Sequence, residues 1–147
     1  MKVGGLEFPD DVRVHPEHDT WARPEPDGSV RVGITALGTR LSGEVYMCRP
    51  KPVGSAVGQG RAIAVVELAK AIVSVRSPLA GTVVEVNGAL AAHPERIHED
   101  PYGEGWIARL RPDAPLDEAG AGLLAGAALA AAAAERIRLE RLDGDAP

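Results

Sequence analysis

Two neighbouring apolar stretches decide the expected fold. They read Ala62-Ile63-Ala64-Val65-Val66-Glu67-Leu68 and Ala71-Ile72-Val73-Ser74-Val75, and only Ala69 and Lys70 separate them. Their density of β-branched residues favours strands over a helix, and two strands joined this closely form a hairpin. The spacing therefore predicts a β-hairpin over residues 62–75 with Lys70 at or near its tip.

Lys70 is the candidate functional residue of this hairpin. Its neighbours are Ala69 and Ala71, so little side-chain bulk surrounds the amine at the end of two rigid strands. That arrangement suits a lysine that one enzyme must acylate and that other proteins must reach afterwards. Position alone favours an ordinary solvated lysine in a turn, and it is the neighbouring motifs that reverse this preference.

Four further short strands are expected, each next to turns that contain Gly or Pro. They cover residues 30–34, 43–48, 82–86 and 106–110. Short strands at such regular spacing are typical of a small sandwich or barrel rather than of a βαβ protein. We therefore predict a mainly β domain over residues 30–111, preceded by an N-terminal extension, residues 1–29, that packs on it.

Two helical segments complete the expected organisation. A short helix is predicted over residues 89–98, and a helical appendage over residues 112–147. The appendage opens with acidic residues, continues as an Ala-rich run and closes with arginines, which complements a helix dipole. Its inner side should carry Leu124, Ala128, Ala131 and either Ile137 or Leu139, and Arg136 can pair with Glu140 one turn later.

Composition excludes several classes of function. The 147 residues carry a formal charge of −5 with a pI near 5.4, so no basic excess is available for nucleic-acid phosphates. An apolar run of about 18 residues, as a membrane span requires, does not occur in the sequence. Cys48 is the only cysteine, and no secretory signal is visible at the start. We expect a protein of the cytoplasm that binds neither nucleic acid nor membrane.

Catalytic motifs do not occur in this sequence. It contains no phosphate-binding loop with a Lys-Ser/Thr ending, no Cys pair and no Gly-x-Ser-x-Gly elbow. His15 and His18 are three residues apart, and His98-Glu99-Asp100 are adjacent, but both sets fall in Pro-rich turns. We interpret them as exposed loop residues, and we expect neither a metal site nor a catalytic residue.

Several motifs resemble the glycine cleavage system H-protein family. Glu67-Leu68-Ala69-Lys70-Ala71, followed by Ser77-Pro78-Leu79-Ala80-Gly81-Thr82-Val83, is similar to the lipoyl-lysine hairpin of that family. Glu99-Asp100-Pro101-Tyr102-Gly103-Glu104-Gly105-Trp106 matches the family pattern without a break and is the most specific part. The resemblance extends from Phe8 to Arg111.

The resemblance implies a lipoyl-domain fold, a barrel-sandwich of two small antiparallel sheets with an N-terminal extension and a C-terminal helix. It implies lipoic acid bound covalently at Lys70. Glu67, Leu68, Ala69 and Ala71 would then be the hairpin residues that the lipoylating enzyme recognises. Glu17 and His18 match a family segment near a groove that shelters the loaded arm, although ordinary surface positions explain them equally well.

The resemblance also implies partners. In the family, a glycine decarboxylase loads an aminomethyl group onto the arm, and a tetrahydrofolate-dependent aminomethyltransferase removes the one-carbon unit. A dihydrolipoyl dehydrogenase then reoxidises the dithiol, and a lipoate ligase or lipoyl synthase pathway installs the cofactor. Such a carrier is not an enzyme, because the cofactor and the partner enzymes supply the chemistry.

Departures from the family pattern motivate rival hypotheses. Leu68-Ala69 replaces a Ser or Thr followed by Val, and Ala36-Leu37-Gly38-Thr39 and Pro50-Lys51-Pro52 also differ from the family. One rival is an H-like lipoate-binding protein that serves a heterodisulfide-reductase-like sulfur-oxidation complex. Another is an unmodified scaffold protein. A biotin carrier is disfavoured, because biotin ligases look for Met on both sides of the lysine.

Cys48 leaves two interpretations open. A small hydrophobic residue buried in a strand is the ordinary one, and a thiol that exchanges with the lipoyl dithiol is the alternative.

Overall fold

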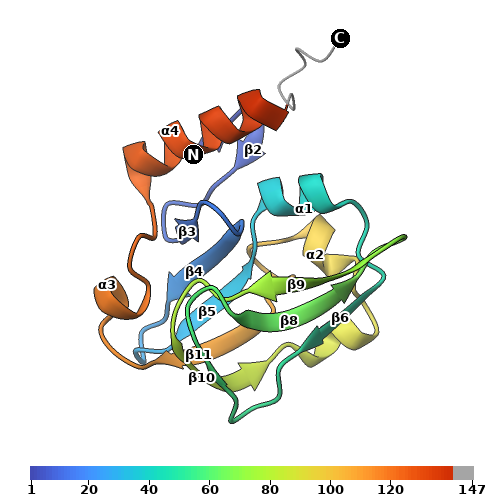
Figure 1. The fold of residues 1–147 in the computed structure, drawn as a ribbon, viewed down its shortest axis with the longest axis vertical. Coiled ribbons are helices and arrows are strands. Elements are labelled where there is room, and N and C mark those ends of the chain that lie inside the picture. The colour runs from blue at the N-terminus through green and yellow to red at the C-terminus, as the bar shows by residue number, and fades with distance from the viewer. Residues whose placement is uncertain (141–147) are drawn as a thin grey trace.

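The computed structural model describes residues 1–140, and its largest element is a six-stranded antiparallel sheet. The strand order in this sheet is β3-β4-β5-β11-β10-β7 (Figure 1). Its strands are β3 (Arg13–His15), β4 (Thr20–Pro24), β5 (Val30–Ile34), β7 (Ala56–Val57), β10 (Gly81–Val86) and β11 (Ala108–Pro112). Neighbours that are distant in sequence, such as β5 and β11, pair directly, so the sheet ties the two halves of the chain together.

A second, three-stranded sheet contains the predicted hairpin. Its order is β6-β8-β9, and its strands are β6 (Met47–Pro50), β8 (Ala62–Glu67) and β9 (Ile72–Arg76). A separate two-stranded ribbon joins β1 (Lys2–Val3) to β2 (Leu6–Glu7). The prediction of a mainly β fold built on two antiparallel sheets is therefore confirmed, as is the hairpin itself.

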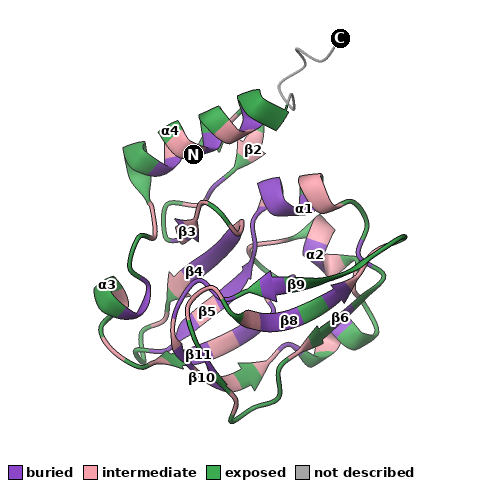
Figure 2. Ribbon diagram, viewed as in Figure 1, coloured by how far each residue is buried: buried purple, intermediate pink, exposed green. Residues whose placement is uncertain are grey.

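The main core lies between the two sheets. Its largest fully buried side chains include Ile63 of β8, Leu110 of β11 and Leu79. After the irregularity between Ala62 and Ala64, strand β8 alternates, so Ala64 and Val66 are buried while Val65 between them is exposed. Figure 2 colours the strands by this burial. This alternation is the period of two that a strand with one buried face must have.

The N-terminal segment contributes strands to the main sheet. β4 pairs with β5 along its whole length, and β3 pairs with β4. Residues 1–29 therefore do more than pack against the β domain. The division into residues 1–29, 30–111 and 112–147 remains a prediction.

A second core lies beneath the C-terminal helix α4 (Gly126–Glu140), which crosses the N-terminal ribbon at the top of Figure 1. Leu129, Ala133 and Ile137 of α4 pack here with Phe8 and Trp21, which are almost completely buried. Ile137 also approaches Gly4, where a Cβ atom would lie 3.0 Å from its Cδ1. The appendage is therefore docked on the N-terminal part of the chain.

The structure corrects the predicted C-terminal helix. Residues 116–119 form a separate short helix, α3 (Leu116–Ala119), and α4 begins only at Gly126. The interruption falls where Gly122 and Gly126 adopt positive φ angles of 84° and 57°, which a continuous helix cannot contain. Of the predicted inner positions, Ala128, Ala131 and Leu139 are exposed. Ile137 is buried as expected, and Leu124 is partly buried against the second core.

Other element boundaries also differ from the prediction. The strand predicted over 43–48 begins only at Met47 and extends to Pro50, and the strand predicted over 106–110 lies at Ala108–Pro112. The helix predicted over 89–98 is two short pieces, η1 (Gly88–Ala91) and α2 (Arg96–Glu99), and Pro94 stands between them. Proline lacks the N–H that a continuous helix needs there.

Helix α1 (Ala36–Ser42) was not expected. Thr35 caps it by accepting a hydrogen bond from the Gly38 N–H at 3.0 Å. The sequence signal that could have revealed it is therefore Thr35, a favoured N-cap residue, directly before Ala36 and Leu37. This helix contributes Gly38, Leu41 and Ser42 to the lining of a groove.

The eight-residue motif at 99–106 is a structural junction. The Tyr102 hydroxyl donates to the Glu7 carbonyl at 2.7 Å and accepts from the Ala36 N–H at 3.0 Å. The Trp21 indole donates to the Pro101 carbonyl, and the Asn87 side chain donates to the Glu104 and Trp106 carbonyls. The motif thus connects the N-terminal ribbon, α1 and the main sheet.

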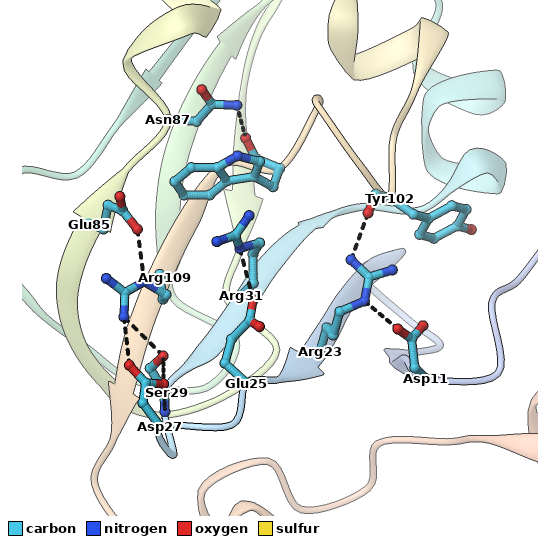
Figure 3. A network of polar contacts seen from close by, with 11 residues as sticks. Asp11, Arg23, Glu25, Asp27, Ser29, Arg31, Glu85, Asn87, Tyr102 and Arg109 are labelled. Atoms are coloured by element: carbon cyan, nitrogen blue, oxygen red, sulfur yellow. Dashed lines mark hydrogen bonds and ion pairs between the residues drawn. The ribbon is translucent and has the colours of Figure 1, made fainter.

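A polar network covers the outer face of the main sheet (Figure 3). Arg109 donates to Glu85, Asp27 and Ser29, and Arg31 pairs with Glu25 while its guanidinium lies over the Trp106 ring. Arg23 pairs with Asp11 at 2.8 Å and donates to the Tyr102 carbonyl (Figure 3). These arginines have protein partners, so we assign the network a structural role. Among the described residues, no helix has both the length and the apolar character needed to cross a membrane.

Candidate functional site

The candidate site is built on the turn between β8 and β9. Glu67 and Ile72 are the last paired residues, and the Leu68 N–H donates to the Ala71 carbonyl at 2.8 Å. Ala69 and Lys70 are therefore the two residues at the tip. The turn projects beyond the body at the right of Figure 1, and the placement of Lys70 at the tip agrees with the sequence prediction.

The Lys70 side chain is exposed, and no hydrogen bond or ion pair joins it to any residue within 1–140. Ala69 and Ala71 are also exposed, whereas Glu67 and Leu68 are half-buried. The four predicted recognition residues therefore divide into two exposed alanines beside the lysine and two residues held against the body. Leu68 packs against the main core.

The outer face of the three-stranded sheet is unusually apolar next to this tip. Met47, Val65 and Ile72 are 41%, 38% and 70% exposed, respectively. Met47 and Ile72 both pair with Glu67, so these three side chains lie on one face in adjacent strands. The surface beside Lys70 is therefore apolar, with the Glu67 carboxylate between Met47 and Ile72.

A groove of about 320 Å³ lies on the opposite face of the hairpin. Its walls are mainly apolar, and Leu68, Val73, Ile34 and Leu41 are among the side chains that line it. Its polar lining comes from His18, Asp19, Ser42, Ser74 and Arg136. The groove therefore combines the hairpin, β5, α1, the loop after β3 and helix α4.

Sequence reasoning identified only part of this groove. His18 lines it as the resemblance implied, but the Glu17 side chain is exposed and does not belong to the lining. Leu41, Val73 and Arg136 were missed. The eight-residue motif at 99–106 contributes no lining residue either.

An ion pair forms part of the polar lining of the groove. Arg136 donates to Asp19 Oδ2 and to the Pro16 carbonyl, both at 2.8 Å. Burial raises the pKa of the Asp19 carboxyl, and the hydrogen bond and positive charge of Arg136 oppose this increase. Arg136 was predicted to pair with Glu140, but it pairs with Asp19 instead, because its side chain points toward the loop rather than along its own helix.

The loop from His15 to Asp19 is more buried than expected. Both histidine rings are half-buried, and they stack with their centroids 4.3 Å apart. Burial lowers the pKa of His15, and the neighbouring His18 acts in the same direction. The interpretation of these histidines as exposed loop residues is therefore wrong, because both are half-buried and His15 is the last residue of β3, although His18 does lie in a loop.

The second histidine set has a structural role. His98 is half-buried on α2, and its Nε2 accepts a hydrogen bond from the Val45 N–H at 2.9 Å. Asp100 accepts from the Glu104 N–H at 2.9 Å. The His98 and Asp100 side chains thus stabilise the backbone around α2.

Cys48 lies in the main core at 5% exposure. Burial raises the pKa of its thiol to about 12. The interpretation of Cys48 as a buried hydrophobic residue is confirmed, and a thiol in this state is poorly suited to disulfide exchange.

Comparison with known proteins places this geometry in a family. A family model described as glycine cleavage H-protein matches residues 12–135. The chain is 48% identical over 101 residues to the glycine cleavage system H protein of Xanthomonas euvesicatoria pv. vesicatoria, covering 69% of this chain and 76% of the relative. It is 44% identical over 107 residues to that of Thermus thermophilus, covering 73% and 82%.

A solved structure agrees with these sequence matches. The chain resembles a glycine cleavage system H protein from Mycobacterium marinum with a TM-score of 0.72 and 32% identity, over 84% of this chain and 96% of that one. The antiparallel sheets, the projecting hairpin and the sequence matches lead to one conclusion. The chain belongs to the glycine cleavage H-protein family.

Proposed function

We propose that Lys70 is the residue that carries the lipoyl group with which this carrier protein serves glycine cleavage. The observation that supports the proposal is the position of Lys70 at the exposed tip of a two-residue turn. The lipoyl group, when attached, supplies a dithiolane that accepts and releases the transferred group. The chain itself supplies the lysine for attachment, the projecting turn that presents it, and the groove that can cover the arm. It acts as a carrier rather than an enzyme.

The two alanines around Lys70 support attachment. A ligase must place the amine in its own active site, and bulky or charged neighbours would hinder that approach. Ala69 and Ala71 are small and exposed, while Glu67 and the apolar side chains of Met47 and Ile72 provide contacts on one side. The recognition surface would thus lie on the outer face of the three-stranded sheet.

The groove supports shelter of the arm. It begins at Leu68 and Val73, which stand two residues before and three residues after Lys70. Its mainly apolar walls suit a hydrocarbon chain with a dithiolane ring, and its volume of about 320 Å³ is at the small end of ligand sites. Leu68, which departs from the family pattern, contributes to this apolar lining.

The partners follow from the family. Components of the glycine cleavage system are implied as a group, and the specific partners that we propose are a glycine decarboxylase, an aminomethyltransferase and a dihydrolipoyl dehydrogenase. Either a lipoate ligase or lipoyl synthase would complete the cofactor. We expect the carrier to meet these enzymes in the cytoplasm. Tethering the dithiolane raises its effective concentration at each active site without permanent binding.

The test is the intact mass of protein produced with lipoate and a lipoate ligase. The parent chain should gain one lipoyl group, and Lys70→Arg should gain none. Lys51→Arg, which changes another exposed lysine, is the matched control and should still gain one. Absence of the added mass from the parent would refute the assignment and favour the unmodified scaffold. Persistence of the mass in Lys70→Arg would refute it by placing the lipoyl group on another residue.

A second measurement tests the groove. On lipoylation, the methyl NMR signals of Leu68 and Val73 should shift, whereas those of Val53, which is 60% exposed and lines no part of the groove, should not. Unchanged Leu68 and Val73 signals would mean that the arm remains in solvent.

The pathway is tested separately. The lipoylated protein should support glycine–bicarbonate exchange with a competent glycine decarboxylase. Failure of that exchange, together with binding to a heterodisulfide-reductase-like complex, would move the protein to sulfur oxidation while leaving Lys70 as the attachment residue.

A further inference from the structure

Three potential metal ligands converge at the end of β3 and in the loop that leads to β4. His15, Glu17 and His18 each offer one nitrogen or oxygen atom, and these atoms all lie within 4.8 Å of one another. Within residues 1–140, no other group of three or more His, Cys, Asp or Glu side chains converges in this way. The feature is therefore specific to this loop rather than a general property of an acidic surface.

An unsatisfied nitrogen marks the same place. His15 Nδ1 is buried, and no described residue forms a hydrogen bond with it. A buried polar atom without a partner is unfavourable, so native structures contain few of them. A metal ion bound at His15 Nδ1 would remove that cost.

The surrounding structure holds the loop in place before any ligand arrives. The Asp19 N–H donates to the His15 carbonyl at 3.0 Å, and Asp19 has a positive φ of 56°, which is uncommon outside glycine. Arg136 then fixes the loop from α4 through Asp19 and the Pro16 carbonyl. Because these contacts already order the backbone, a metal ion would lose little affinity to the ordering of its ligands.

We propose that His15, Glu17 and His18 form a zinc-binding site. Two imidazoles and one carboxylate are the protein ligands of open zinc sites, in which a water or another group takes the fourth position. Imidazole ligands also suit Ni²⁺ and Cu²⁺. At most nitrogen and oxygen sites the affinity rises from Ni²⁺ to Cu²⁺ and is lower again for Zn²⁺. The site borders the groove through His18, which belongs to both.

The proposal does not depend on lipoylation, so its test uses the unmodified protein. The full chain, carrying Lys70→Arg and no affinity tag, would be freed of metal and titrated with Zn²⁺ in competition with a chromophoric chelator. One Zn²⁺ should bind per chain. Co²⁺ in its place should give the visible absorption bands of a four- or five-coordinate site.

Ligand variants identify the site. Glu17→Gln and His18→Gln should each weaken Zn²⁺ binding by more than the roughly 10–100-fold that loss of an outer-shell partner costs. His93→Gln is the matched control, because His93 is also a surface histidine beside a carboxylate, 3.1 Å from Glu95. It should leave the affinity unchanged.

Two outcomes would overturn the proposal. One is the absence of stoichiometric Zn²⁺ binding to the parent. The other is an affinity in Glu17→Gln and His18→Gln equal to that in His93→Gln. Glu17 is exposed, so its variant tests the ligand role without a large effect on folding, and circular dichroism of each variant checks the fold.

Discussion

Arg136 and Asp19 are 117 residues apart in the chain, and their side chains meet at 2.8 Å. The contact joins the C-terminal helix to a loop that lines the groove. Asp19 is 15% exposed in its side chain, so the pair is shielded from most solvent. The helix is therefore part of the framework of the site as well as of the second core.

Replacing Arg136 by Met should lower the free energy of unfolding by about 1–3 kcal/mol, because Asp19 and the Pro16 carbonyl lose their donor. Urea denaturation measures the effect. Arg138→Met is the control, since Arg138 is exposed and forms an ion pair with Glu135 on the same helix, and it should cost less than about 1 kcal/mol. Equal costs would contradict a special role for the long-range pair.

Gly33→Ala should destabilise the protein by about 1–3 kcal/mol through overpacking. A Cβ atom at Gly33 would lie 2.7 Å from the ring of Trp21, which is completely buried and pairs with Gly33 across β4 and β5. Gly88→Ala, where no atom lies within 4 Å of the added carbon, should have a much smaller effect. Urea unfolding followed by tryptophan fluorescence compares the two, and similar midpoints would show that the ring can move aside.

The Cys48 thiol should react slowly with thiol reagents in the folded protein. With a thiol pKa of about 12, only about one molecule in 10⁴ carries a thiolate at pH 8. An aromatic disulfide reagent should therefore react slowly with the native protein. In denaturant it should release one equivalent of its aromatic thiolate per chain. Rapid labelling of the native state would place the thiol outside the core.

Cys48→Ser should in turn leave reoxidation of a lipoyl arm unchanged. Slower reoxidation would restore the redox interpretation of this residue.

The Tyr102 phenol should lose its proton at a higher pH than an ordinary tyrosine. Burial raises its pKa from 10.0 to about 12, so the folded state favours the neutral phenol. The associated stability is complete below pH 10 and is lost as the pH rises toward 12, by up to about 3 kcal/mol. In Tyr46→Phe protein, ultraviolet absorbance should show the remaining phenol titrating near pH 12.

The control for this titration is the double variant with Tyr46→Phe and Tyr102→Phe. Its urea midpoint should depend less on pH between 10 and 12 than that of Tyr46→Phe alone. An equal dependence would assign the loss of stability to other groups.

The sequence by itself determined the local features of this protein. The hairpin with Lys70 at its tip follows from two β-branched apolar stretches only two residues apart, and strand β5 follows from its side-chain pattern after a turn that contains Gly and Pro. Both signals depend on residues within a few positions of one another. The motifs that resemble the family are equally local. Element ends were less predictable, because Met47–Pro50 and Ala108–Pro112 owe their limits to pairing with distant strands.

Only the tertiary structure decided what surrounds the hairpin. Val73, Leu41 and Arg136 come from three separate elements, and they line one groove because the sheet and the two helices bring them together. The buried face of α4 was likewise set by Phe8 and Trp21, which pack with Leu129 and Ala133 rather than with the predicted Ala128 and Ala131. Ile137 alone of the predicted α4 positions is buried there. Contacts over more than 100 residues leave no periodic signal in a sequence, since they depend on how the whole chain packs.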